Sequence, residues 1–528
     1  MGYQSTVGHS HTVLMIVNTV ASANRLLDIV GLFDSDPRVQ LVFSTPPNST
    51  VTDGVAEVFA TLGVRTLDWG SVLRTRFDLA ITANHSGSLH QVRAPVVVIS
   101  HGVGYTKKSP RAQSPEPRAQ SPEPRAQSPA YGLSREWLLH EGALVADTLV
   151  LSHEEQLHRL AAAVPEATGS AVVAGDPCYD RILASTTRRR IFREALGCTD
   201  DTRLIVTTST WRQGSAFGAW PTMLRQLMAE LSPVHHRVAA ILHPHVWHQH
   251  SPWQVRTWLA DCLRAGLVLI PPLEGWRAAL IAADVVVGDH GAVTCYAAAM
   301  GKPVVLAAFD EDEVVAGTSV ALLGELAPRL DPHQPLLPQL DVTSGYEPVR
   351  ELVTSFPFRA AELHRELFYR KLGLSEPDSH LVQPLLPSDG LSPGSGPQAL
   401  LVSGTTERLR LRAADVRPSM TGDCFLAAHT DHPVRSLRTN ADVLFGTVSD
   451  EELAGVLDRT PSSLIAVSET TGVALVRGHS PVRILGSDRV VGACALHAWL
   501  SAHPNELPVT LDVDVDGRAY RFALPSLR

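Results

Sequence analysis

Cysteine is scarce in this chain, and its spacing excludes two kinds of protein. The 528 residues contain six cysteines, and no two of them form a Cys-x-x-Cys pair. This scatter excludes a disulfide-rich scaffold and a zinc finger, and it is typical of free thiols in a reducing compartment. Neither a metal site nor a cofactor is expected.

Long apolar runs are absent as well. No stretch approaches ~20 consecutive apolar residues, which a membrane-spanning helix would need. No basic segment precedes the short apolar run near the N-terminus, so a secretory signal is not expected either. The sequence predicts a cytoplasmic protein, with peripheral contact at the inner face of a membrane left open.

Positive charge is in deficit, and lysine above all. The formal net charge of -9 argues against a general nucleic-acid binder, whose surface would be basic. Only four of the 45 basic residues are lysines, and two of them, Lys107 and Lys108, are adjacent. In a chain that prefers arginine, a retained lysine indicates a compact ammonium placed on phosphate. Two solvated lysines beside a loop are the alternative interpretation.

What the chain does contain is an alternation of short apolar runs and amphipathic segments. Strands are expected at 12–17, 39–44, 77–82 and 95–100, and a second series begins at residue 203. Such alternation is typical of parallel sheets with crossover helices. Four regions are predicted: a Rossmann-like domain over 10–185, a second over 186–376, a Pro/Ser/Gly-rich linker over 377–397, and a small α+β module with an antiparallel sheet over 398–528.

A proline-rich repeat interrupts the first series. Residues 109–129 hold three copies of a seven-residue unit in which no apolar residue is larger than alanine. Such a segment cannot form a core, so it is predicted to be a disordered loop insertion. Repeat expansion in a tolerant surface loop is favoured over a flap that covers a site.

Two histidines stand where strands are expected to end. His101 precedes Gly102, and His243 precedes a proline in the second half of the chain. Open parallel sheets bind ligands at the carboxyl ends of their strands, so the two rings are expected on opposite walls of an interdomain cleft. An imidazole there can act as a general base, although a structural strand cap is the alternative. The three histidines after His243 have no acid or cysteine beside them, which favours a solvated turn over a metal centre.

Two further loops have the chemistry to bind phosphate. Ser209, Thr210 and Arg212 follow a predicted strand, and hydroxyls with a guanidinium hold phosphate by charge-assisted hydrogen bonds. The segment 288–294 opens a helix after another strand, where free N–H groups attract an anion.

The order of these motifs resembles the CDP-glycerol glycerophosphotransferases, the family of teichoic acid primases and polymerases. Over roughly residues 10 to 375 the chain shows, in the family's order, His101-Gly102 with Lys107 or Lys108, Gly175 to Asp180, Thr210 to Arg212, His243-Pro244, and Asp289 with Lys302-Pro303. The resemblance implies a GT-B fold, with two Rossmann-type, doubly wound parallel-sheet domains that face a cleft.

The resemblance also implies roles for individual residues. His101 would be the base on the acceptor hydroxyl. Contacts to phosphate or acceptor would come from Gly102, Lys107 and Lys108. Donor binding would fall to Ser209, Thr210, Arg212, His243, Asp289, Gly291 and Thr294. The implied donor is a CDP- or UDP-linked group, and the implied acceptor is a polyol phosphate or a glycan.

The loop after Asp289 departs from the family. Gly291 and Ala292 stand where the family usually has two hydroxyl residues, so two expected phosphate contacts are missing. The resemblance favours an enzyme, a transferase that moves a glycerophosphate-like or glycosyl group to a hydroxyl. A UDP-sugar 2-epimerase is an alternative that needs further carboxylates in the cleft. A non-catalytic descendant that binds a nucleotide or a partner protein is the other, and the altered loop favours it.

Overall fold

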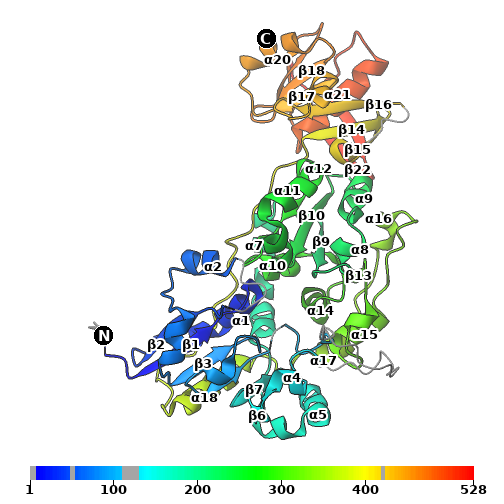
Figure 1. The fold of residues 1–528 in the computed structure, drawn as a ribbon. Helices are drawn as coiled ribbons and strands as arrows, with labels where there is room; N and C mark the ends of the chain where they lie inside the picture. Colours follow the sequence, from blue (N-terminus) through cyan, green and yellow to red (C-terminus); the bar gives the residue numbers. More distant parts are fainter. Residues whose placement is uncertain (1–7, 48–53, 101, 110–129, 418–422, 528) are drawn as a thin grey trace.

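The computed structural model describes the chain except for residues 1–7, 48–53, 101, 110–129, 418–422 and 528. His101 and all but Ser109 of the proline-rich repeat belong to these ranges. The predictions made for His101 and for the repeat therefore lie outside the described residues. In Figure 1 the described chain forms three bodies that follow one another along the molecule, from the blue N-terminal sheet to the orange C-terminal module.

The first body is built on a six-stranded parallel sheet in the order β2-β1-β3-β4-β7-β8. Its central strands are apolar and buried on both faces, as expected when helices cover both sides of a sheet. The strands are β1 (His11–Ile16), β2 (Val39–Ser44), β3 (Leu79–Thr82), β4 (Val96–Val98), β7 (Thr148–Leu151) and β8 (Ala171–Val173), with a separate hairpin of β5 (Leu139–His140) and β6 (Ala143–Leu144). The helices are α1 (Val20–Val30), α2 (Val55–Leu62), α3 (Trp69–Arg74), α4 (Arg135–Leu138) and α5 (Glu154–Ala163).

The second body has a five-stranded parallel sheet in the order β11-β10-β9-β12-β13. Its strands are β9 (Arg203–Ser209), β10 (His236–Leu242), β11 (Val268–Leu269), β12 (Val285–Gly288) and β13 (Val304–Leu306). Its helices are α6 (Pro177–Ala184), α7 (Arg189–Ala195), α8 (Ala216–Ala219), α9 (Met223–Glu230), α10 (Pro244–His250), α11 (Pro252–Trp258), α12 (Ala260–Arg264), α13 (Trp276–Ala282), α14 (Ala292–Ala299), α15 (Ser319–Leu326), α16 (Leu336–Gln339) and α17 (Glu347–Glu351).

The chain then returns to the first body through α18 (Ala360–Leu372). The apolar face of this helix completes the core under β1 and β3, where Phe368 stacks on Phe33 at 5.7 Å between ring centroids. From there the Pro/Ser/Gly-rich segment runs back along the second body, as the olive-yellow trace in Figure 1 shows. The segment is packed, because Leu386 is buried and its N–H donates to Ser185.

The C-terminal module contains a nine-stranded mixed sheet in the order β20-β19-β18-β17-β16-β14-β15-β21-β22. The sequence predicts an antiparallel sheet here. This prediction is wrong, because β16, β17 and β18 run parallel in the middle of the sheet. The strands are β14 (Ala399–Gly404), β15 (Arg408–Ala413), β16 (Cys424–His429), β17 (Val443–Gly446), β18 (Ile465–Ser468), β19 (Val473–Val476), β20 (Val482–Arg483), β21 (Thr510–Val515) and β22 (Arg518–Ala523). The helices are α19 (Arg435–Thr439), α20 (Glu452–Arg459) and α21 (Arg489–Ala502).

Together these sheets confirm the predicted fold class of two parallel α/β sheets with an additional C-terminal module. The module contacts the second body through polar groups, among them Arg264 to Asp415 at 2.6 Å and the buried His235 to the Val515 carbonyl at 2.7 Å. The domain boundaries given above remain predictions.

Candidate functional site

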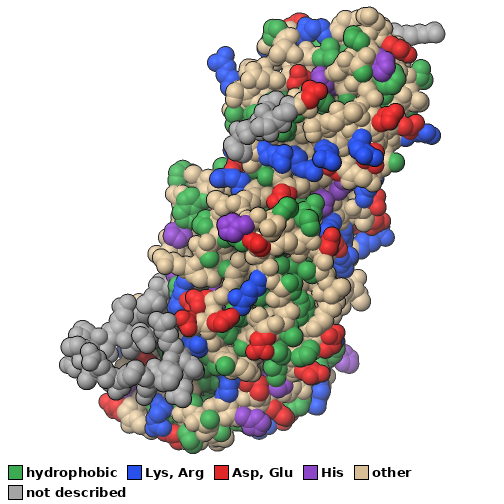
Figure 2. All heavy atoms as spheres, turned by 90° about the vertical axis from the view of Figure 1, so that its right-hand side faces the viewer, with side chains coloured by type: hydrophobic (Ala, Val, Ile, Leu, Met, Phe, Trp, Pro, Cys, Tyr) green, Lys and Arg blue, Asp and Glu red, His purple; other side chains and the backbone are tan. Residues whose placement is uncertain are grey.

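Loops at the carboxyl ends of β9 and β12 meet a segment from the first body. We call Lys107, Thr210, Arg212, Asp289, His290 and Glu313 the interdomain site. Thr210 and Arg212 come directly after β9, and Asp289 and His290 directly after β12, at strand ends of the kind where doubly wound sheets bind ligands. Lys107 and Glu313 lie on two segments, one from each body, that pair with each other. On the face shown in Figure 2, acidic and basic side chains are interspersed over the lower part, and a row of basic side chains crosses the upper part.

Lys107 reaches from the first body to the second. Its segment pairs with residues 313–315 through two backbone bonds, Lys108 N–H to the Glu313 carbonyl and Val315 N–H to the Thr106 carbonyl, both at 2.9 Å. The Lys107 ammonium donates to Thr210 Oγ1 at 2.9 Å. Burial lowers the pKa of Lys107, and the nearby carboxylates of Asp289 and Glu313 oppose this shift. A cation of one body is therefore held against the strand-end loop of the other.

Asp289 holds the backbone of the loops that follow β9 and β12. Its fully buried carboxylate accepts the N–H groups of Thr210 and Ala216 at 2.8 Å and that of Gly291 at 2.9 Å. A carboxylate with three such bonds is committed to shaping the β9 and β12 loops. A direct contact between Asp289 and a donor remains a prediction.

The glycine at position 291, where the family usually has a hydroxyl residue, has a steric explanation. A Cβ atom at Gly291 would lie 2.9 Å from Asp289 Oδ1 and 3.3 Å from the Cβ of Thr210. A hydroxyl residue therefore does not fit here unless this carboxylate moves, although the backbone N–H of Gly291 is retained in the loop.

The hydroxyls of Ser209 and Thr294 are engaged within the protein. Thr294 Oγ1 lies 2.7 Å from the hydroxyl of Thr208 and accepts the Asp289 N–H at 3.2 Å. Ser209 Oγ accepts the Phe217 N–H at 2.9 Å. Both side chains are buried, so they support the loop, and their predicted contacts with a donor remain predictions.

Arg212 has an unusual backbone conformation. Its φ of 83° lies in the left-handed region, which a residue with a Cβ adopts at an energetic cost. The guanidinium stacks over the ring of Trp211, 4.4 Å from the centroid, and its Nη1 lies 3.5 Å from a Glu313 oxygen. The strand-end turn thus aims a cation at the same carboxylate that Lys107 approaches.

His290 and Glu313 are site residues that the sequence analysis missed. His290 Nδ1 accepts the Asp310 N–H at 3.3 Å, which leaves Nε2 to donate to Glu313 Oε2 at 3.2 Å. This hydrogen bond lowers the pKa of Glu313, and burial opposes the shift. The acidic run 310–313, shortly after the Lys302-Pro303 motif, was the signal that could have indicated a carboxylate in this loop.

The remaining candidates lie around this site. His243 caps α10, and its Nδ1 accepts the His245 N–H at 3.1 Å. Its backbone N–H donates to the Ser209 carbonyl, so the ends of β10 and β9 are joined. Gly102, at φ 81°, packs so closely on α14 that an added Cβ would lie 3.2 Å from that of Ala292. Lys108 donates to the Glu311 carbonyl at 3.2 Å.

Lys302, which the resemblance aligns with the Lys-Pro motif, has a structural role. Its ammonium donates to the carbonyls of Ile281 and Ala283 at 2.7 and 2.8 Å, at the end of α13. Burial lowers the pKa of Lys302 to about 8. Within the described residues, no three histidine, cysteine or acidic side chains come together as metal ligands, and no helix is long and apolar enough to cross a membrane.

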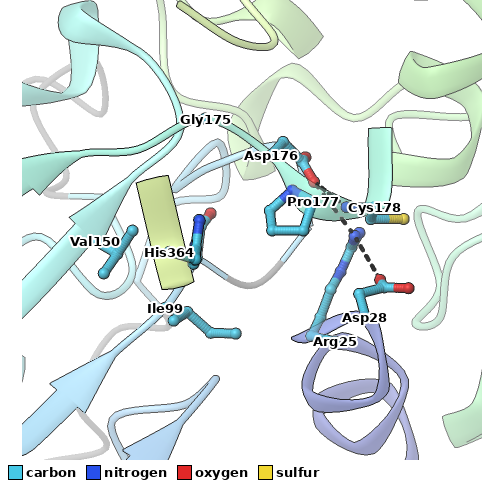
Figure 3. Close-up of a pocket in the computed structure, with 10 residues that line it drawn as sticks. Arg25, Asp28, Ile99, Val150, Gly175, Asp176, Pro177, Cys178 and His364 are labelled. Carbon is cyan, nitrogen blue, oxygen red and sulfur yellow. Dashed lines mark hydrogen bonds and ion pairs between the residues drawn. The ribbon is translucent and has the colours of Figure 1, made fainter. Parts of the chain in front are cut away.

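A second group of charges lies between the same two bodies. We call Arg25, Asp28, Asp176, Arg181 and Arg277 the buried charge cluster. The Asp28 carboxylate accepts hydrogen bonds from Arg181 Nη1 at 2.6 Å and from Arg277 Nη2 at 2.8 Å. Arg25 Nη1 lies 3.8 Å from Asp176 Oδ1. Figure 3 shows Arg25 aimed between Asp28 and Asp176, beside a cavity of about 20 Å³. That volume holds roughly one water molecule, so the cavity is too small for a nucleotide.

The Gly175 to Asp180 motif belongs to this second region. Asp176 caps α6 and accepts the Tyr296 hydroxyl at 2.5 Å. Asp180 accepts the N–H groups of Phe358 and Ala360 at 2.7 and 2.9 Å, at the start of α18. Burial raises the pKa of Asp180 to about 6. Asp180 therefore joins elements of the two bodies where the chain crosses between them, and Asp176 faces Arg25 of the first body.

Comparisons with known proteins show a resemblance in fold and nothing more. No family model and no curated protein matches the chain. The wall teichoic acid polymerase TagF, in a variant soaked with CDPG, matches at 11% identity and a TM-score of 0.46, over 69% of this chain and 89% of that chain. The MnaA-UDP co-structure from S. aureus matches at 14% and 0.39, over 70% and 100%. The UDP-GlcNAc 2-epimerase of Methanocaldococcus jannaschii matches at 11% and 0.39, over 68% and 99%. Similarities this low decide neither activity nor ligand.

Proposed function

We propose that this protein is a transferase that binds the phosphate groups of a nucleotide-activated donor between its two α/β bodies. The observation that supports this proposal best is the convergence of Lys107, from one body, with Thr210, Arg212 and His290, from the other. Cations and hydroxyls at strand ends are the groups that hold a pyrophosphate by charge-assisted hydrogen bonds. Lys107, Thr210 and Arg212 follow one another in the order in which the CDP-glycerol glycerophosphotransferases carry these motifs.

The proposed reaction displaces a nucleotide from the donor. The acceptor hydroxyl loses its proton to His101, a bond forms from its oxygen to the transferred group, and the bond to the nucleotide's phosphate oxygen breaks. Lys107 and Arg212 would stabilise the negative charge that develops on that leaving oxygen. His290 Nε2 would donate a hydrogen bond to the same phosphate.

A thermal-shift screen with CDP-glycerol, UDP-N-acetylglucosamine, CMP and UMP tests donor binding. A ligand at a hundred times its Kd should stabilise the fold by about 2.7 kcal/mol. For a ligand that binds, release of CMP or UDP in the presence of a polyol phosphate or glycan acceptor is the expected result. Binding without release would support the non-catalytic alternative, and the absence of any binding would refute the proposal.

A UDP-sugar 2-epimerase is the second candidate, and Glu313 is the observation that favours it. Proton removal from the sugar needs a carboxylate or a similar base, and Glu313 lies beside His290 at the interdomain site. Incubation with UDP-N-acetylglucosamine in D₂O separates the two reactions. An epimerase would incorporate deuterium at C2 without transfer to an acceptor, whereas the proposed transferase would leave C2 unlabelled.

A further inference from the structure

The Glu313 carboxylate lies where several positive or N–H donor groups converge. His290 Nε2 donates to Oε2 at 3.2 Å, and Arg212 Nη1 lies 3.5 Å from Oε1. The positive charge of Lys107 also favours the ionised form of Glu313 and helps to lower its pKa. These are the same groups that the proposed function assigns to phosphate. A single carboxylate therefore takes the place of an anion in the site.

We propose that Glu313 is an internal counter-anion, which a phosphate group of the incoming ligand must displace from Arg212 and His290. This inference rests on the proposed function, because it concerns the same phosphate position. It adds a residue that sets the affinity of the site for phosphate ligands.

The position of Glu313 suits such displacement. Its side chain is 22% exposed, whereas the other carboxylate near Lys107, that of Asp289, is fully buried and bound to three backbone N–H groups. The Glu313 backbone is held separately, since its carbonyl accepts the Lys108 N–H at 2.9 Å. Rotation of the side chain can therefore free the cations without separating the two paired segments.

The energetic consequence has a definite sign. A ligand that must displace Glu313 binds only to the fraction of molecules in which the cations are free, so its apparent affinity is lowered by that fraction. Neutralising Glu313 removes the competitor and leaves the cations in place. An ordinary structural ion pair predicts the opposite, because its loss would loosen the site and weaken binding.

The test measures the affinity of inorganic pyrophosphate by calorimetry for the full chain and three variants. Glu313→Gln should bind pyrophosphate about tenfold more tightly than the wild type, and Glu313→Asp should stay closer to the wild type because it keeps the charge. Glu311→Gln is the matched control, since Glu311 lies two residues away and pairs with Arg329 at the surface with a side chain that is 75% exposed. Its affinity should stay within about twofold of the wild type, because screening by water weakens the effect of an exposed charge.

The outcomes separate this inference from the proposed function. Unchanged or weaker pyrophosphate binding by Glu313→Gln, with donor binding and nucleotide release intact in the wild type, would overturn the counter-anion role alone. Equal tightening in Glu311→Gln would also overturn it, because the effect would then be one of general charge. Tighter pyrophosphate binding by Glu313→Gln without any binding of activated nucleotides would leave Glu313 as the counter-anion and refute the proposed donor. If neither wild type nor Glu313→Gln binds pyrophosphate or an activated nucleotide, both proposals fail.

Discussion

The buried charge cluster and the interdomain site hold charges between the same two bodies, yet they are balanced differently. In the cluster, Asp28 accepts from two arginines at 2.6 and 2.8 Å, and the side chain of Arg277 is only 2% exposed. In the interdomain site, Arg212 lies 3.5 Å from its carboxylate with a side chain that is 40% exposed. The first group is held by short, buried contacts within the protein, whereas the ion pair of the second is longer and partly exposed.

This difference separates charges that hold the bodies together from charges that can serve a ligand. A buried ion pair cannot lose one member without leaving an uncompensated charge, so it cannot easily exchange partners. A partly exposed pair is cheap to break, because water screens the separated charges. The four predictions below test this contrast, from the largest expected effect to the smallest.

The largest effect is expected in the buried charge cluster. Arg277→Met removes one of the two arginines that bond to Asp28, and also the partner of the Asn24 side chain, which Arg277 contacts at 2.8 and 3.0 Å respectively. Breaking a buried pair from one side costs about 3–5 kcal/mol, to be measured by urea denaturation. Arg190→Met is the control, because the Arg190 side chain is 85% exposed and its loss should not measurably change stability. A loss below about 1 kcal/mol for Arg277→Met would show that the cluster does not hold the bodies together.

The next largest effect is expected in the pH dependence of stability, through a histidine in the same region. His364 lines the cavity beside Arg25, and burial lowers the pKa of His364 to about 4. The native ring stays neutral while the unfolded one takes up a proton near pH 6.5, so stability falls as the pH drops from about 6.5 to 4, by about 3 kcal/mol. His364→Phe should abolish this part of the acid loss, as judged from denaturation curves at pH 7 and 4.5. Parallel losses in both proteins would contradict it.

A change in the interdomain site should act on binding instead. Lys107→Met removes the cation that bonds to Thr210 and should weaken pyrophosphate and donor binding by about 10- to 100-fold. Stability should change little, because burial already disfavours the ammonium and lowers the pKa of Lys107. Wild-type binding should also decline as the pH rises through this lowered pKa, a decline that the variant lacks. Lys371→Met on α18 is the control and should bind as the wild type does; equal weakening in both variants would remove Lys107 from the site.

The smallest effect concerns the strained turn at Arg212. Both Arg212→Ala and Arg212→Gly lose the cation, so both should bind pyrophosphate more weakly. They should differ in stability by about 0.5–1 kcal/mol in favour of glycine, because glycine adopts the φ of 83° without a steric cost. Thermal unfolding of the two variants side by side measures this difference. If the alanine variant is the more stable one, the turn stores no strain.

Local patterns were enough to predict most of the scaffold. Runs such as residues 12–17 and 285–287 are apolar and β-branched, so they became buried parallel strands, and the alternation with helices indicated two such sheets. The C-terminal module was harder to predict, because the direction in which β16, β17 and β18 pair depends on where their connecting helices pack. That choice is made between segments far apart in sequence.

The sequence by itself determined which chemical groups stand at strand ends, among them Lys107, Thr210 and Arg212. Only the tertiary structure decided which of them meet. The hydrogen bond from Lys107 to Thr210 joins residues that are 103 positions apart in sequence and that lie in two different bodies. It also decided that Asp289 is committed to backbone N–H groups while Glu313, unnoticed in the sequence, faces the cations. The reason is physical: a residue's type fixes the charge it can carry, whereas burial and the geometry of its neighbours decide whether that charge is tied down or open to exchange.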